Sequence, residues 1–218
     1  MDDALQIPSF QEWVTYCFTD PVPKIPWEDD PPPETMVRYL VQLFEAPRVA
    51  TAGLSDERIG KGLWHICGYD GYLKSARDDD VPHDLQIRCI ESLKVLYRDL
   101  FAVRCGPLLQ HLLTPDDPVK GTALDTICYM LFDLSQIEGA TTTIGEEHLV
   151  DPIFDVLEYA LGLDSVACQE SALHGLGHLW LFHSKRVPPI VDRYLAAHPD
   201  LDERLRSYAG AARVGVVR

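Results

Sequence analysis

Apolar side chains recur along this chain at the spacing of an α-helix. Between Phe10 and Phe18 they stand at positions i, i+3, i+4, i+7 and i+8, and the stretch from Leu85 to Leu100 continues with the same period. No segment shows the sustained apolar–polar alternation, enriched in β-branched residues, that is typical of a strand. The pattern predicts an all-α protein of about eight to ten helices.

Prolines and capping residues mark where these helices begin and end. Pro82 is expected to open the longest helix of the chain, which ends before Gly106. Thr143, with Glu146 three residues later, resembles a capping box, in which each side chain bonds the backbone N–H of the other residue. This pair predicts a helix that runs through Ala160.

A proline-rich segment precedes the second helix. Residues 21–33, PVPKIPWEDDPPP, hold proline at six of thirteen positions. Because proline lacks a backbone N–H and fixes φ, we expect an extended arm that wraps the surface, with Ile25 and Trp27 as anchors. A ligand for a proline-recognition domain is the alternative. The chain is accordingly divided into an N-terminal helix with the extended arm, residues 1–34, packed on a helical domain, residues 35–218.

The stretch Ser165–Phe182, SVACQESALHGLGHLWLF, predicts an amphipathic helix around which the chain is organised. Its apolar residues collect on one face, while Glu170, His174 and His178, at i, i+4 and i+8, line the other. Two glycines lie between the histidines, and each costs a helix roughly 1 kcal/mol relative to alanine. We therefore expect another helix or a partner's backbone to approach closely there.

Charge and cysteine usage narrow the function classes. The 218 residues carry a formal net charge of -15, with 34 acidic against 19 basic side chains, which argues against nucleic acid and anionic membranes as partners. Such acidity suits solubility or a basic partner. The six cysteines are scattered without a C-x-x-C pair, so we expect reduced core residues. The N-terminus lacks a signal-peptide pattern, and a cytoplasmic location is expected.

A repeat of about 40 residues underlies the helix pattern. Cys89, Cys128 and Cys168 are spaced 39 and 40 residues apart on three predicted helices. The segment from residue 120 onward resembles HEAT-like repeats of the HEAT/armadillo class, with ACQESALHGLGHL as a first helix and PPIVDRYLAAH as a second. The whole chain also resembles an uncharacterised family of bacterial helical proteins through SDERIGKGLW, CYMLFD and CQESALHGLGHL.

The resemblance implies a single-domain, right-handed α-solenoid of helical hairpins that binds other macromolecules along one set of helices. It brings no catalytic residues with it. In such a stack the first helices lie side by side, so their polar faces form one surface, which is either solvated or a partner groove. The residues expected on that surface are Arg58, Lys61 and His65; Glu91 and Arg98; Asp125, Tyr129 and Asp133; and Glu170, His174 and His178.

The leading hypothesis is a non-enzymatic protein-binding module without cofactors, such as an acidic, immunity-type neutraliser of a basic protein. The competing hypothesis is a metal-dependent enzyme or metal-binding protein centred on Glu170, His174 and His178, with Asp125 or Asp133 completing the site. The sequence holds no H-E-x-x-H and no G-x-S-x-G. His183 and His111, expected at helix ends or in loops, are assigned no role.

Overall fold

Helices dominate the part of the chain that the computed structural model describes, which comprises residues 7–19, 21, 24, 27, 30–114, 116–118 and 120–217. None of these residues lies in a β-strand, so the all-α prediction is confirmed for them. The α-helices are α1 (Phe10–Cys17), α2 (Pro33–Glu45), α3 (Pro47–Ala50), α4 (Asp56–Cys67), α5 (His83–Leu96), α6 (Ala102–Arg104), α7 (Ala123–Leu134), α8 (Val150–Leu161), α9 (Val166–His183), α10 (Val187–Ala197) and α11 (Glu203–Ala212). Among the described helices we find none whose length and apolarity would let it cross a membrane.

Short tight turns connect these helices. One π-helical turn, η2 (Tyr97–Phe101), continues α5 into α6. The other turns are 3-10 helices: η1 (Tyr72–Arg77), η3 (Gln110–Leu112), η4 (Ile137–Thr141) and η5 (Glu147–Leu149).

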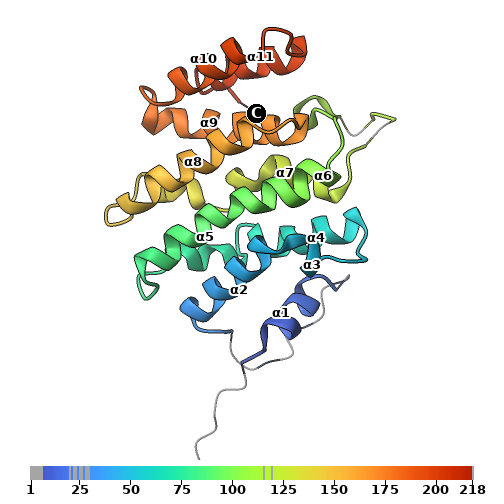
Figure 1. Cartoon of the computed structure of the whole chain (residues 1–218), viewed down its shortest axis with the longest axis vertical. Coiled ribbons are helices and arrows are strands. Elements are labelled where there is room, and N and C mark those ends of the chain that lie inside the picture. Colours follow the sequence, from blue (N-terminus) through green and yellow to red (C-terminus); the bar gives the residue numbers. More distant parts are fainter. Residues whose placement is uncertain are drawn as a thin grey trace, which may run out of the picture.

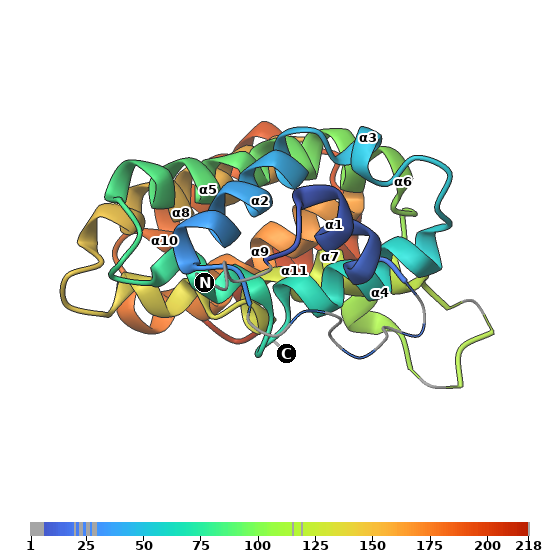
Figure 2. The same cartoon turned by 90° about the horizontal axis from the view of Figure 1, so that it is seen from below.

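The helices pack in two layers (Figure 1). In one layer α4, α7, α9 and α11 lie side by side in that order, and in the other α2, α5 and α8 do the same. The layers are seen end-on in Figure 2, and the packing of α8 against α9 joins them. At one end of the stack α1 packs on α4, and at the other α10 packs on α9 and α11. The apolar core fills the space between the layers, where Phe44, Phe101, Phe132 and Phe154 are fully buried.

Local capping explains several helix starts. The Ser55 side chain accepts the N–H of Arg58, which caps α4 as the sequence predicts. Thr122 and Asp125 form a capping box at the start of α7. α4 ends at Gly68, also as predicted.

The helix start predicted at Thr143 is wrong. α8 begins only at Val150, and the Glu146 carboxylate pairs with Arg77 at 2.6 Å instead of capping a helix. The same guanidinium donates to the Gln136 carbonyl at 2.7 Å and to the Thr143 hydroxyl at 3.1 Å. Arg77 thus ties η1 to the connection between α7 and α8, and it takes both side chains that a capping box would need.

The central helix differs from the amphipathic helix predicted for it. α9 has 18 residues. The helix predicted to begin at Pro82 and to end before Gly106 is present as one unbroken run, in which α5 passes through the π turn η2 into α6 and ends at Arg104. From Ala167 through Gly177 every residue of α9 is buried, the polar ones included. Neighbouring helices and connections therefore surround this stretch, and its polar side chains face protein groups rather than water.

Two glycines of the helices, Gly60 and Gly175, lie where the packing is close. A Cβ added at Gly175 would stand 2.8 Å from Leu157 Cδ2, so the close approach expected there is confirmed. Gly60 lies where α4 crosses α7, and a Cβ there would overlap backbone atoms of Ala123 and Leu124. The two helix backbones are in direct contact at that crossing.

Part of the predicted arm can be placed. Trp27 packs edge-to-face on Tyr16 of α1 with ring centroids 4.8 Å apart, in agreement with its expected role as an anchor. The other expected anchor, Ile25, lies outside the described residues. Pro33 is the first residue of α2. The division into an arm and a helical domain stays a prediction.

Candidate metal centre

A fully buried carboxylate lies in the middle of α9. Glu170 accepts the backbone N–H groups of Gln110 and His111 at 2.9 and 3.0 Å, and its Oε1 lies 2.5 Å from His111 Nδ1. The N–H groups at the start of the turn η3 have no partner within the turn, and the carboxylate supplies one. These donors occupy both oxygens, and the group of potential ligands that converge does not include Glu170, so the structure does not bring Glu170 into the candidate metal site of the competing hypothesis.

Tyr208 of α11 links this carboxylate to the histidines of α9. Its ring stacks on the His111 ring with centroids 3.9 Å apart, and its hydroxyl lies 2.7 Å from His174 Nδ1 and 3.0 Å from the Tyr129 hydroxyl. We call the connected side chains the polar network. Its members are His111, Tyr129, Asp133, Glu170, His174, His178 and Tyr208.

One end of the polar network has the geometry of a metal site. The Nε2 atoms of His174 and His178 are 3.2 Å apart, and Asp133 Oδ1 lies 3.8 Å from His178 Nε2. All three potential ligand atoms fall within 4.8 Å of one another. Ligand atoms bound to a tetrahedral zinc ion at 2.0–2.2 Å are about 3.3–3.6 Å apart, so small side-chain rotations would bring this set onto one ion.

Burial and hydrogen bonding orient the potential ligand atoms and leave one side of the site open to solvent. His174 is 2% exposed, and because Tyr208 occupies its Nδ1, its Nε2 is directed toward His178. The side chains of His178 and Asp133 are 31% and 35% exposed, so the site opens to solvent on their side. A metal ion could therefore enter from solvent and keep a water molecule as a further ligand.

Electrostatics keep the buried histidine available as a ligand. Burial, followed by the charges of His178 and His111, lowers the pKa of His174 to about 3. The imidazole is thus neutral at physiological pH, which metal coordination requires. Burial also raises the pKa of Tyr208 above its ordinary value, so the phenol keeps its proton.

Glu138 of η4 lies near this end of the network. Burial, followed by the negative charge of Asp133, raises the pKa of Glu138 to about 7. Its Oε2 atom is buried and has no hydrogen-bond partner among the described residues. η4 packs on α9, so this carboxyl group lies near enough to Asp133 for the two charges to interact.

Replacing Glu138 by glutamine is expected to change how stability depends on pH. A carboxyl group with a raised folded-state pKa stabilises the fold below its ordinary value of 4.5, and this contribution is lost as the pH rises through about 7. We expect the free energy of unfolding of the variant, relative to that of wild type, to increase by on the order of 1 kcal/mol as the pH rises from about 5 to about 8. This value is discounted for the partial exposure of the side chain. Urea unfolding at several pH values measures it. Parallel stability curves for the two proteins would contradict this assignment.

The other residues expected on the polar surface divide into separate places. Arg58 and Lys61 of α4 are exposed, with Arg58 Nε donating to the Phe18 carbonyl and Lys61 3.5 Å from Glu57. His65, also on α4, packs edge-to-face on two tyrosine rings. These residues share a layer with α7 and α9 but are not part of the polar network.

Two of the expected residues belong to the other layer. Glu91 of α5 pairs with Lys94, and Arg98 of the turn η2 pairs with Asp99. Because α5 packs between α2 and α8, these side chains cannot join a surface formed by α4, α7 and α9. The expectation of one continuous polar surface is corrected on this point.

Four of the residues expected on the polar surface are buried, which is a further correction of that expectation. Asp125, Tyr129, Glu170 and His174 are all at most 8% exposed, so they do not face outward. Asp125 accepts the N–H of Gly106 at 2.8 Å in addition to capping α7, and it is not part of the metal site. Asp133, named from the sequence as one of two carboxylates that could complete a site, is the one beside the histidines.

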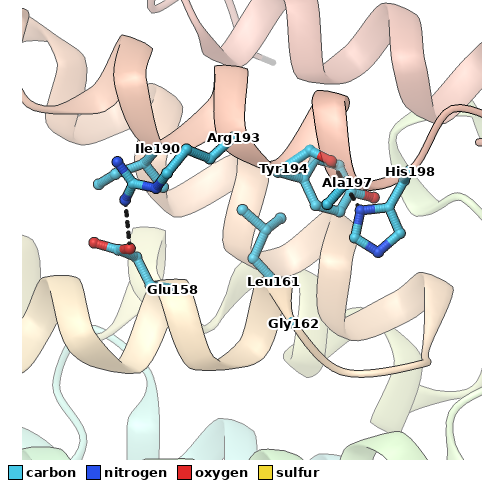
Figure 3. Close-up of a pocket in the computed structure, with 8 residues that line it drawn as sticks. All are labelled: Glu158, Leu161, Gly162, Ile190, Arg193, Tyr194, Ala197 and His198. Carbon is cyan, nitrogen blue, oxygen red and sulfur yellow. Dashed lines mark hydrogen bonds and ion pairs between the residues drawn. The ribbon is translucent and has the colours of Figure 1, made fainter.

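A separate hollow lies between α8 and α10 (Figure 3). Its volume is about 210 Å³, and an ion pair between Glu158 and Arg193 at 2.8 Å stands on its rim. The Tyr194 hydroxyl there is already satisfied by Gln169 at 3.1 Å. Ligand pockets usually measure roughly 300–1,000 Å³ and contain convergent polar groups, so this hollow is a weaker candidate than the polar network.

Comparisons with family models, with curated proteins and with solved structures found no match for this chain. The candidate metal centre is therefore argued from the geometry of its own residues.

Proposed function

We propose that the protein binds a divalent transition-metal ion, with zinc as the best-fitting ion, through Asp133, His174 and His178. The observation that carries this proposal is the convergence of two imidazole nitrogens and one carboxylate oxygen, from adjacent helices, within 4.8 Å. Imidazole and carboxylate ligands suit zinc and related dications, and a pair of histidines at i, i+4 on one helix can share such an ion.

The surroundings of the three ligands support this proposal. A ligating histidine normally holds its second ring nitrogen in a hydrogen bond, and the Tyr208 hydroxyl is placed for that role on His174. Structural zinc sites have four protein ligands, whereas three ligands leave a position for water or for another molecule. The partial exposure of Asp133 and His178 favours a centre of this open kind.

Zinc titrated into metal-stripped, untagged protein is expected to bind at about one equivalent and to raise the melting temperature. At a free concentration of 100 times the Kd, binding would stabilise the fold by about 2.7 kcal/mol. A His174→Ala, His178→Ala double variant should lose this binding in calorimetry. Asp133→Asn, on the exposed side of the site, should weaken it by at least about tenfold with little effect on folding.

Two matched variants sharpen this experiment. Tyr208→Phe removes the hydroxyl behind His174 and should reduce zinc affinity by about 10–100-fold while leaving one equivalent bound. His198→Ala, at the end of α10 and outside the polar network, should bind zinc as wild type does. Stoichiometric zinc retained by the double variant, or no stoichiometric zinc bound by wild type, would refute the proposed site.

We further propose that the two layers form a short right-handed solenoid of helical hairpins. The side-by-side order of α4, α7, α9 and α11, with α2, α5 and α8 in the second layer, supports this arrangement. The protein partner, its basic character and the cytoplasmic location expected from the sequence stay predictions. A salt-sensitive complex captured at low ionic strength would support a basic partner.

A further inference from the structure

Two histidines from separate segments stack on each other at the surface. His83 is the first residue of α5, and His148 lies in the turn η5 that leads into α8. Their rings are nearly parallel, with an interplanar angle of 12° and centroids 3.8 Å apart. His83 is exposed, and His148 is half-buried. Neither residue belongs to the polar network, so the stack is independent of the candidate metal centre.

A hydrogen bond fixes the His148 ring against α5. The side-chain amide of Gln86 donates from Nε2 to the carbonyl of Asp78 at 2.9 Å, which turns its Oε1 toward His148 Nε2, 2.6 Å away. An amide oxygen only accepts, so His148 Nε2 carries a hydrogen atom. An additional proton would therefore go to Nδ1 and make the ring a cation.

Charged groups lie close to this ring. In the turn that holds His148, Glu146 pairs with Arg77 at 2.6 Å, and Glu147 accepts a backbone N–H at 3.0 Å. Burial, followed by the charge of His83, lowers the pKa of His148. The negative charges of Glu146 and Glu147 oppose this shift without cancelling it.

Ion pairs engage most of the other charged side chains on the elements that pack against η5. These pairs are Arg88–Glu45 and Lys94–Glu91 at α5, and Asp151–Arg186 and Glu158–Arg193 at α8. The other acids on these elements are Asp84 of α5, Asp155 of α8 and Glu138 of η4. Their charges act in the same direction as those of Glu146 and Glu147, so they do not cause the lowered pKa.

We propose that His83 and His148 form an acid-sensitive clasp, which holds the connection between α7 and α8 against α5 at neutral pH and loosens in mild acid. Neutral imidazoles can stack, but rings 3.8 Å apart leave no room for an anion between two positive charges. Arg77 fastens the same connection through Glu146, and an arginine–carboxylate pair keeps its charges in mild acid. The opening should therefore begin at η5 and leave η4 in place.

The direction of the pH effect follows from the lowered pKa of His148. The unfolded chain binds a proton at this residue near the ordinary pKa of 6.5, whereas the folded chain binds it only at lower pH. The stabilising contribution of the clasp is thus complete above about pH 6.5 and is lost as the pH falls from there toward the folded-state pKa. The amide of Leu149, which donates to the Glu146 carbonyl at 2.9 Å, reports the loosening.

The test is nuclear magnetic resonance of the full-length chain between about pH 5 and about pH 8. We expect the His148 imidazole to titrate below pH 6.5 in wild type and at a higher pH in His83→Gln, which removes the second titrating ring from an exposed position. Hydrogen exchange at the Leu149 amide, corrected for its intrinsic pH dependence, should accelerate roughly three- to tenfold from about pH 7.5 to about pH 5.5 in wild type. In His83→Gln the acceleration should be less than about twofold.

A control and three contrary outcomes complete the experiment. His198→Gln, at the end of α10 and outside the clasp, should behave as wild type in both measurements. The proposal is overturned by a His148 titration that His83→Gln does not change, by a Leu149 amide equally protected at both pH values in wild type, or by equal acceleration in wild type and His83→Gln. The second outcome is read without any variant. Glu138 is present in both proteins, so its own titration cannot produce a difference between them.

Discussion

Gly60→Ala is expected to destabilise the protein by about 3 kcal/mol or more, although alanine favours a helix over glycine by about 1 kcal/mol. The added methyl group would overlap the backbone of Ala123 and Leu124, where α4 crosses α7. A flexible side chain could rotate away from such a contact, but the first turn of α7 cannot. Urea unfolding, followed by circular dichroism, measures the loss.

A matched substitution separates the clash from the effect of alanine itself. Gly210 lies in α11 and is exposed, and a Cβ added there would have no atom within 4 Å. Gly210→Ala should therefore stabilise the protein by about 0.5–1 kcal/mol. If the two variants were equally stable, α4 and α7 could not be as closely packed as described.

Glu170→Ala is expected to cost about 3–5 kcal/mol, because it removes a fully buried carboxylate that accepts from two partly buried N–H groups and contacts an imidazole. The groups left without a partner are the amides of Gln110 and His111 and the His111 ring. The connection between α6 and α7 should then detach from α9. Hydrogen exchange at the amides of residues 110 and 111 should accelerate, and proteolysis should cut this connection first.

Two other variants frame this result. Glu170→Gln keeps the shape and one carbonyl oxygen, so its loss of stability should be smaller than that of the alanine variant. Glu158→Ala removes an exposed carboxylate paired with Arg193 and should cost about 1 kcal/mol or less. A Glu170→Ala variant as stable as Glu158→Ala would mean that η3 is not held by this carboxylate.

Much of the fold could be predicted because it is encoded locally. The 3.6-residue period of apolar side chains, Ser55 as an N-cap and Gly68 as a helix end all concern neighbours in sequence. The same kind of local pattern gives a wrong helix start at Thr143, although Thr143 and Glu146 have the residue types and the spacing of a capping box. Arg77, 69 residues before Glu146 in the chain, binds that carboxylate, and no local pattern records such a competitor.

The character of α9 was mistaken for a related reason. Polar residues at helical spacing look the same whether water or protein groups satisfy them. Glu170 is satisfied largely by backbone amides, which leave no trace in residue identity. The low exposure of this stretch could be known only once η3 and α11 were placed against it.

The candidate site was predictable in part. The i, i+4 spacing of His174 and His178 indicates that the two side chains can bind one metal ion, and the sequence offers Asp133 as a further ligand. The sequence pattern assigns no role to His111 or Tyr208, although both are members of the polar network. Tyr208 lies 34 residues beyond His174, on a helix with its own cap and apolar pattern, and nothing in that pattern marks its hydroxyl.

The Tyr208 hydroxyl has one proton and two neighbours, His174 Nδ1 and the Tyr129 hydroxyl. It can donate to only one of them at a time. A metal ion on His174 Nε2 would leave the imidazole proton on Nδ1, so His174 would donate to Tyr208 and Tyr208 to Tyr129. Without the ion the row can run in the opposite direction. Metal binding at the partly exposed site would thus set the direction of the hydrogen bonds between buried side chains.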